Sequence, residues 1–223
     1  MTLYHGSENI IYKPLYGFGS ASNDFGRGFY CTESKDLSKE WACKNGDDGF
    51  SNKYSLDMRG LSVLKLNDEP YHILNWLALL TCFRGYWQRK SIAEDAKKLL
   101  QDNYLIDISS FDVIIGYRAD DSYFSFAQDF IMGTISLEQL SSAMDLGHLG
   151  EQVVLKSEKA FERIKYLSHE NASAEIFFKK KSERDVTARR AYSDMRSSGD
   201  RLNETYIIDI MRGRVNDDDL RLR

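Results

Sequence analysis

Short apolar stretches alternate with polar, glycine-containing loops over the first third of the chain. "TLYH" at the start and "GFYCT" at 28–32 are rich in β-branched and aromatic residues, which predicts two strands, and the mixed stretch 8–23 between them predicts a long loop. "SKDLSKEWACKN" predicts a helix, because Ser34 can cap its first turn and Leu37 and Trp41 lie on one face. "KYSLDMRGLSVLKL" then predicts two further strands.

Longer apolar periods in the middle of the chain predict a group of helices. Residues 70–83 and 91–101 have helical patterns, and the first is apolar on nearly every side, so it is either buried or a surface that faces a partner. "FDVIIGYR" at 111–118 is a continuous apolar run that predicts a strand. Two more helices are expected after it, "SYFSFAQDFIMG" with Asp120 and Asp121 as caps and "SLEQLSSAMDLG" between Ser136 and a closing Gly147.

The last third of the chain returns to strands and ends in a polar tail. "EQVVLKS" and "FERIKYLS" predict two strands that pair around 157–160, and "NETYIIDIMRG" at 203–213 predicts a short helix with a closing glycine. Strands early, helices in the middle and strands late predict an α+β fold with a mostly antiparallel or mixed sheet, rather than alternating βαβ units.

Composition limits the class of protein. The 223 residues suit one domain with appendages, and a formal net charge of −4 excludes a basic field over the whole chain for gripping nucleic acid. The three cysteines have no CxxC spacing, which indicates reduced thiols in a cytoplasmic protein. We expect no leader segment and no membrane contact, because the longest apolar stretch, at 71–83, is too short and too interrupted to span a bilayer.

Three short pieces, "YHGS", "FGRGFYCT" and "LGEQVVL", each place one reactive group at the end of a predicted strand: His5, Tyr30 and Glu151. Taken singly, these residues are typical of a hydrogen-bonded core histidine, a packed strand aromatic and an exposed turn carboxylate. Gly26 and Gly28 can likewise mark a tight bend alone. The interest of the three pieces lies in their combination.

Together the three pieces resemble the ADP-ribosyltransferase superfamily, in the branch typified by diphtheria toxin and the poly(ADP-ribose) polymerases. That branch carries a His–Tyr–Glu triad on three separated strands, in motifs similar to "HGS", "FGKGIYFA" and a glutamate just before a valine-containing strand. The chain has "HGS", "FGRGFYCT" and "GEQVVL" in the same order. The resemblance covers residues 3–43 and 147–167, and it extends to an uncharacterised bacterial branch whose members are often encoded beside small partner proteins.

The resemblance implies a fold and a domain organisation. We expect an ADP-ribosyltransferase-like split β-sheet core, mixed or antiparallel, in a catalytic domain over residues 1–170 with a helical insertion at about 68–110. Residues 171–223 are expected to form a mostly helical extension that packs on the same domain.

The resemblance also implies NAD as the substrate, with no metal, and a role for each residue of the motifs. Glu151 would stabilise the oxocarbenium-like charge that develops when the glycosidic bond breaks, with Tyr30 and His5 completing the catalytic triad. Tyr30 and Trp41 would stack on the nicotinamide ring. The other expected NAD contacts are His5 and Ser7 at the adenosine-side ribose, Gly6 and Ser38 at the carboxamide, Gly26 and Gly28 where the loop approaches the ligand, and Arg27 at a phosphate or the acceptor.

The acceptor is less defined by the sequence. Arginine-specific relatives place Glu or Gln two residues before the catalytic glutamate, where this chain has Leu149, so an arginine acceptor is disfavoured. A chain of this length without accessory domains suggests transfer of a single ADP-ribose. The basic run "FKKKSERDVTARR" can steer phosphates or form a solvated helical face. The triad argues against the reaction of relatives that act on RNA 2′-phosphates.

Three functions therefore stand. The first is an intracellular mono-ADP-ribosyltransferase, a toxin-like bacterial effector in defence or in a toxin–antitoxin pair, acting on a protein or nucleic-acid acceptor. The second is an NAD glycohydrolase, and the third is a catalytically silent module that senses NAD or docks a partner. A neutralising, antitoxin-like partner is expected from the family context and from the apolar helix at 70–83.

Overall fold

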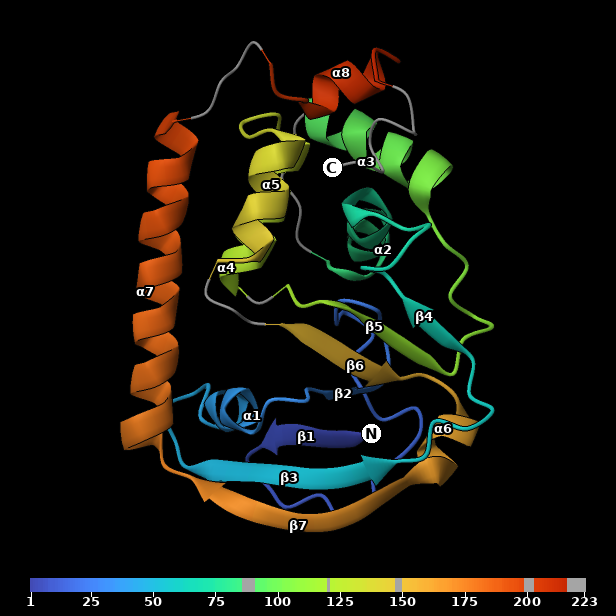
Figure 1. The fold of residues 1–223 in the computed structure, drawn as a ribbon, viewed down its shortest axis with the longest axis vertical. Helices are drawn as coiled ribbons and strands as arrows, with labels where there is room; N and C mark the ends of the chain where they lie inside the picture. The colour runs from blue at the N-terminus through green and yellow to red at the C-terminus, as the bar shows by residue number, and fades with distance from the viewer. Residues whose placement is uncertain (86–90, 120, 147–149, 199–202, 216–223) are drawn as a thin grey trace.

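The computed structural model describes residues 1–85, 91–119, 121–146, 150–198 and 203–215, and it contains two β-sheets beside a group of helices (Figure 1). The first sheet has the order β1-β3-β7, and both of its pairings are antiparallel. The second has the order β2-β6-β5-β4, with β4 and β5 parallel and the other pairs antiparallel. The strands are β1 (Thr2–Ser7), β2 (Phe29–Cys31), β3 (Gly49–Leu56), β4 (Val63–Lys65), β5 (Val113–Tyr117), β6 (Glu151–Leu155) and β7 (Ile164–Ala172).

The helices lie mostly between and after the strands of the second sheet. They are α1 (Lys35–Ala42), α2 (Ile73–Phe83), α3 (Ser91–Tyr104), α4 (Asp121–Ile131), α5 (Leu137–Met144), α6 (Glu158–Arg163), α7 (Ala174–Ser198) and α8 (Ile207–Met211). The α+β class with mixed and antiparallel sheets is thus confirmed. Ser34 and Ser136 accept the backbone N–H groups expected of N-caps, from Leu37 and Gln139. Asp120 and Gly147, expected at helix ends, lie outside the described residues.

The predicted pairing of two late strands around 157–160 is wrong. The hydroxyl of Ser157 accepts the N–H of Ala160 at 3.1 Å and caps α6, so the first part of "FERIKYLS" is helical. After α6 the chain crosses to the other sheet, where β7 pairs with β3. A serine that starts a helical turn therefore changes which sheet the last strand joins.

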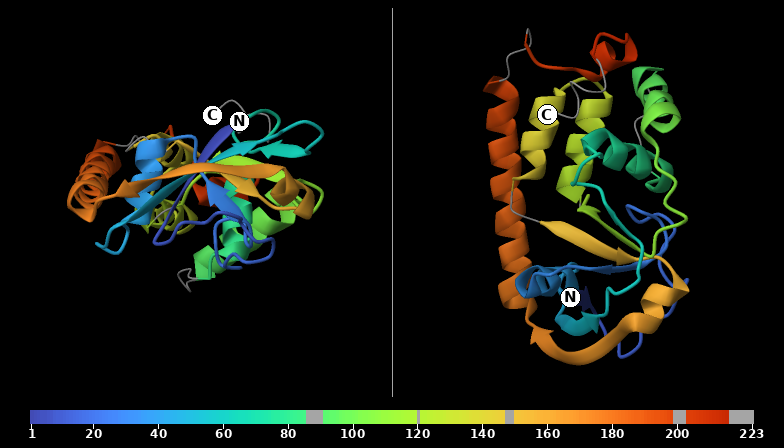
Figure 2. Two further views of the ribbon diagram at one scale, coloured as in Figure 1. Left: turned by 90° about the horizontal axis from the view of Figure 1, so that it is seen from below. Right: turned by 45° about the vertical axis from the view of Figure 1, so that its right-hand side comes forward.

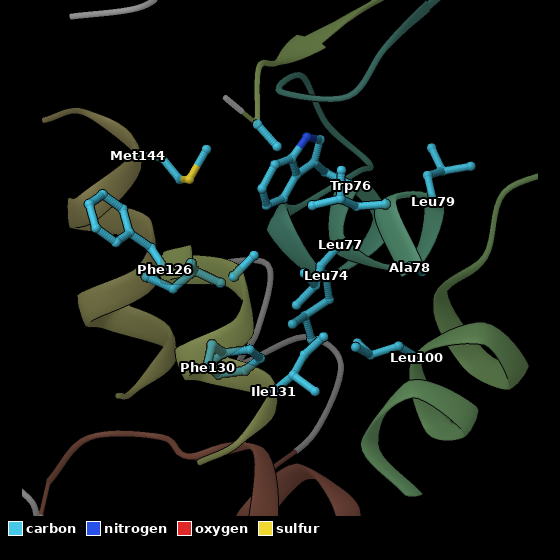
Figure 3. Close-up of a cluster of buried hydrophobic side chains, with 14 of the residues drawn as sticks. Leu74, Trp76, Leu77, Ala78, Leu79, Leu100, Phe126, Phe130, Ile131 and Met144 are labelled. Carbon is cyan, nitrogen blue, oxygen red and sulfur yellow. The ribbon is translucent and has the colours of Figure 1, made fainter. Parts of the chain in front are cut away.

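Two hydrophobic cores cover the two faces of the second sheet. The smaller core lies between the sheets and joins Leu3 and Tyr54 of the first sheet to Cys31 and Val153 of the second. The larger core packs the helices on the opposite face of the second sheet, where Val154 contributes. Figure 3 shows part of it, with side chains from α2, α3, α4 and α5 meeting. Burying such side chains contributes about 1.5–3 kcal/mol each.

The apolar helix predicted at 70–83 is buried, as one of its two interpretations expected. Leu74, Trp76 and Leu77 on α2 are fully buried in the larger core (Figure 3). The indole N–H of Trp76 donates to the carbonyl of Tyr117 at 3.0 Å, which ties α2 to the end of β5. This apolar face is filled by the chain itself and is not exposed for a partner.

Helix α7 runs along one side of the molecule, from the first sheet to the helical half (Figures 1 and 2). It is attached to α1 by a bidentate ion pair, in which Nε and Nη2 of Arg184 donate to one oxygen of Glu40 at 3.0 and 2.9 Å. Both side chains are largely shielded from water. Of the helices in the described part of the chain, none is long and apolar enough to cross a membrane.

The two sheets meet at one point, between β1 and the end of β2. The N–H of Tyr4 donates to the carbonyl of Thr32 at 2.8 Å, and the N–H of Thr32 donates back to Tyr4 at 2.9 Å. Helix α1 follows this junction directly and packs on β1 at Gly6. A Cβ atom at Gly6 would lie 1.9 Å from the backbone oxygen of Ser38, so only glycine lets the helix approach the strand.

Substituting Gly6 by alanine therefore forces α1 away from β1. We expect Gly6→Ala to lower the free energy of unfolding by about 1–3 kcal/mol or more, as overpacking does. Urea unfolding followed by circular dichroism measures this change, with Gly85→Ala as the control because a Cβ there meets no atom of the described residues within 4 Å. Equal stability of both variants would show that α1 does not depend on this contact.

Candidate functional site

A cavity of about 540 Å³ opens beside the junction of the two sheets. Its lining includes His5 and Gly6 from β1, Gly28 just before β2, Tyr30 on β2 and Trp41 from α1. The structure thus brings five of the predicted site residues to one place, although they come from three different elements. The loop after β1 forms part of the wall through Ile11 to Gly19.

His5 is fixed by a backbone hydrogen bond. Its Nδ1 lies 2.7 Å from the carbonyl oxygen of Tyr30, and because a carbonyl can only accept, Nδ1 carries the proton. Burial lowers the pKa of His5, and the charge of Lys44 lowers it further against the effect of this hydrogen bond. A neutral ring protonated at Nδ1 has Nε2 as a hydrogen-bond acceptor.

The hydroxyl of Tyr30 holds the glycine-rich turn that precedes β2. It donates to the carbonyl of Gly26 at 2.7 Å and accepts the N–H of Phe25 at 3.0 Å. Lys156 on the far side of the turn donates from Nζ to the carbonyls of Phe25 and Arg27. Burial raises the pKa of Tyr30 far above its usual value, so the phenol stays protonated.

Gly26 and Gly28 are required in this turn for different structural reasons. Gly26 has a positive φ of 71°, which favours glycine. Gly28 instead packs against β6, since a Cβ there would lie 2.7 Å from Cγ1 of Val154 and 2.8 Å from the backbone oxygen of Leu155. Gly28 therefore lets the turn lie close to β6, which is the strand that carries the third motif.

The ring of Trp41 lies in the cavity wall beside a cation. The guanidinium of Arg118 stacks over the indole, 4.0 Å from its centroid. Arg118 also lines the cavity. A cationic aromatic ligand that stacks on Trp41 uses the other face of the indole or displaces Arg118.

Four predicted site residues do not line the cavity. The hydroxyl of Ser7 donates to the carbonyl of Asn9 at 2.6 Å. Ser38 is fully buried, and its hydroxyl donates to the carbonyl of Lys35. Gly26 is not among the lining residues, and the guanidinium of Arg27 donates to the carbonyl of Gly17 at 2.9 Å. The hydroxyls of Ser7 and Ser38 and the guanidinium of Arg27 are thus hydrogen-bonded within the protein.

Glu151 also lies elsewhere. It is exposed, it accepts a hydrogen bond from Asn67 at 2.8 Å, and it lines a second cavity of about 560 Å³ together with Tyr117 and Asp145. The next residue, Gln152, lines the first cavity and is only 2% exposed. Successive residues of a strand point to opposite faces, so the two cannot both face one cavity.

Asp24 is a second group that sequence reasoning did not place at the site. It lines the cavity and is 5% exposed, and its Oδ2 accepts from Nε2 of Gln152 and from the N–H of Ala119, both at 2.9 Å. Nε of Arg84 lies 3.6 Å from Oδ1. The sequence signal that could have pointed to Asp24 is its position one residue before the glycine-rich motif.

The cavity is electropositive although the chain is acidic. Among the described residues that line it, four side chains are cationic and one, Asp24, is a carboxylate, in a chain whose formal net charge is −4. The cationic residues are Lys44, Arg84, Arg118 and Lys181. Such a lining favours an anionic ligand such as a phosphate ester.

Three of the six basic residues of the run on α7 form ion pairs within the protein. Lys179 and Lys180 form ion pairs with Glu183 and Asp36 at 3.9 and 3.4 Å, and Arg184 pairs with Glu40. Lys181 is the member that reaches the cavity. In the described part of the chain, no group of three or more His, Cys, Asp or Glu side chains is arranged to hold a metal ion.

Comparison with known proteins gives one match. A family described as "Protein of unknown function (DUF3990)" matches residues 1–166, which contain His5, Tyr30 and Gln152 and leave out α7. No curated protein and no solved structure matches the chain.

The burial of Asp24 has a measurable consequence for stability. Desolvation raises the pKa of Asp24 above its ordinary value of 3.8, against its two hydrogen bonds and the charges of Arg84 and Arg118. Between the ordinary and the raised pKa, the folded state holds the proton more tightly than the unfolded state. The contribution of Asp24 to the free energy of unfolding therefore falls as the pH rises through this interval and is lowest above it.

We expect the stability of the wild-type protein relative to Asp24→Asn to decrease as the pH rises from about 4, the ordinary pKa of the carboxyl, through the raised pKa of Asp24. Urea unfolding of both proteins at a series of pH values measures this difference, and other titrating groups cancel in it. A difference that grows with pH would show that the arginines outweigh the burial.

Proposed function

The chain belongs to the DUF3990 family of unknown function, and we propose that this protein is an NAD-dependent mono-ADP-ribosyltransferase that binds NAD in the cavity beside the sheet junction. One observation carries the proposal: His5, Gly6, Tyr30 and Trp41, separated in the sequence, line the same cavity. They are the residues to which the resemblance assigns the ribose, the carboxamide and the nicotinamide ring.

The arrangement of the strands supports an ADP-ribosyltransferase-like fold. A three-stranded and a four-stranded sheet meet at β1 and β2, and the third motif enters on β6, which pairs with β2. His5 and Tyr30 therefore lie on opposite sides of the split between the sheets, joined by one hydrogen bond. A split sheet of this kind is what the family resemblance implies.

The charge and shape of the cavity suit a dinucleotide. Lys44, Arg84 and Lys181 can neutralise a diphosphate, and the acceptor Nε2 of His5 can bind a ribose hydroxyl. The indole of Trp41 already holds a cation on its face, which is the property that a nicotinamide ring requires.

The proposed reaction breaks the bond between C1′ of the ribose and the nicotinamide nitrogen. The electron pair leaves with the nicotinamide, and an oxocarbenium-like ribose develops. An acceptor nucleophile then forms a bond to C1′ and releases its proton to water. The acceptor is a protein or a nucleic acid, and the pairing of Lys179, Lys180 and Arg184 within the chain weakens the case for α7 as a phosphate track.

In this proposal the protein is a toxin-like effector that acts in the cytoplasm of a bacterium, in defence or in a toxin–antitoxin pair. A neutralising partner remains a prediction from the family context. The apolar face of α2 cannot be its contact, because Leu74, Trp76 and Leu77 are buried.

A second candidate function is a module that binds NAD without turning it over. The observation that favours it is the position of Glu151, which is exposed on the second cavity and leaves the amide of Gln152 at the first. An NAD glycohydrolase uses water in place of the acceptor, and it differs from a transferase only in its product, which is free ADP-ribose.

Calorimetric titration with NAD and chromatography of released nicotinamide test the proposal together. We expect NAD to bind, His5→Ala to weaken binding about tenfold through the lost hydrogen bond, and His169→Ala, on the exposed strand β7, to leave it unchanged. Radiolabelled NAD in a cell lysate should label a macromolecule.

The outcomes separate the candidates. Nicotinamide release with no labelled macromolecule indicates a glycohydrolase, and binding without release indicates the silent module. A folded protein that binds no NAD contradicts the proposal, as does equal loss of affinity in the two histidine variants.

A further inference from the structure

Gln152 occupies the position in the cavity that the sequence assigned to Glu151. On β6, Gln152 shares its face with Val154, and Val154 packs in the larger core while Val153 and Leu155 pack between the sheets. Glu151 lies on the other face and at the other cavity. The strand alternation is fixed by three buried side chains, so exchanging the two residues requires a shift of the whole strand.

The amide of Gln152 is oriented by its two partners. Its terminal nitrogen lies 2.9 Å from a carboxylate oxygen of Asp24 and 3.0 Å from the carbonyl oxygen of Tyr117. Both partners only accept, so the atom between them is Nε2 and both of its protons are used. Among the described residues none donates to the remaining atom, Oε1, which is therefore the polar atom of this side chain left for a ligand.

Above its pKa, Asp24 supplies negative charge to this amide from the turn that precedes β2. Its other contacts, the N–H of Ala119 and the guanidinium of Arg84, hold the carboxylate in one position. A hydrogen bond from an amide to a carboxylate polarises the amide and makes its oxygen a better acceptor. The charge of Asp24 thus acts through the amide of Gln152, and the carboxylate itself does not need to contact the ligand.

We propose that Gln152 is the third ligand-binding residue of this cavity, that its Oε1 accepts a hydrogen bond from the 2′-hydroxyl of the nicotinamide ribose, and that Asp24 is the positioning residue that holds the amide. Glu151 takes no part. This inference rests on the proposed function, because it requires NAD in the cavity. No bond to Gln152 forms or breaks, and a hydrogen bond to this hydroxyl strengthens as charge develops on the ribose.

Calorimetry with two ligands tests the inference apart from turnover. The probes are NAD and an NAD analogue that lacks the 2′-hydroxyl of the nicotinamide ribose, titrated into the full chain at a temperature where turnover is negligible. We expect the wild-type protein to prefer NAD by about tenfold, the worth of one hydrogen bond to a well-placed acceptor. In Gln152→Met, which keeps the volume and removes the amide, this preference should disappear.

Three further variants complete the test. Glu151→Gln is the matched control and should retain the full preference. Asp24→Asn should reduce the preference to less than half, because the uncharged partner holds the amide less firmly. Gln152→Asn, whose oxygen is drawn back by one methylene, should lose the preference while it keeps an amide, so a folding defect of the methionine variant does not decide the result.

The results distinguish the two levels of the argument. If the wild-type protein binds neither ligand, the proposed function fails and this inference with it. If NAD binds and the preference survives in both Gln152 variants, the inference alone is overturned. If the preference is lost in Glu151→Gln and kept in the Gln152 variants, the ligand meets Glu151 after all.

Discussion

The junction between the two sheets is the constraint on which the site depends. Two backbone hydrogen bonds join Tyr4 to Thr32, and the ring of His5 adds a third to the carbonyl of Tyr30. Because the sheets touch there and diverge beyond it, a cavity opens beside β1 and β2. The packing of α1 on Gly6 follows from the same junction and brings Trp41 to the wall. Geometry at one backbone contact thus sets the positions of three residues from separate segments.

A second feature is the contrast between the cavity and the rest of the chain. In an acidic protein, the described lining of the cavity has four cationic side chains and one carboxylate, Asp24, which is almost fully buried. Burying a charge is costly unless partners satisfy it, and Asp24 has Gln152, Ala119 and Arg84. A buried polar network of this kind is typical of a functional site, where burial and neighbouring charges shift the pKa values of the reactive groups.

Much of the local structure could be predicted from the sequence, because caps and apolar periods are local signals. Ser34 and Ser136 cap their helices, and the strand at 111–118 forms close to its predicted bounds. The sequence does not show which face a residue occupies in a strand that is buried on both sides. The residues "VVL" that follow Gln152 are all apolar, so alternation could not show whether Glu151 or Gln152 faces the cavity. Only the register of β6 against β2 and β5 decides it.

A crystal structure of the protein with a non-hydrolysable NAD analogue would decide where the ligand lies. The account predicts the nicotinamide ring beside Tyr30 and Trp41, the diphosphate near Lys44 or Lys181, and a ribose hydroxyl within hydrogen-bonding distance of Oε1 of Gln152. An analogue bound in the second cavity against Glu151, or a first cavity without ligand in crystals that contain the analogue elsewhere, would contradict it.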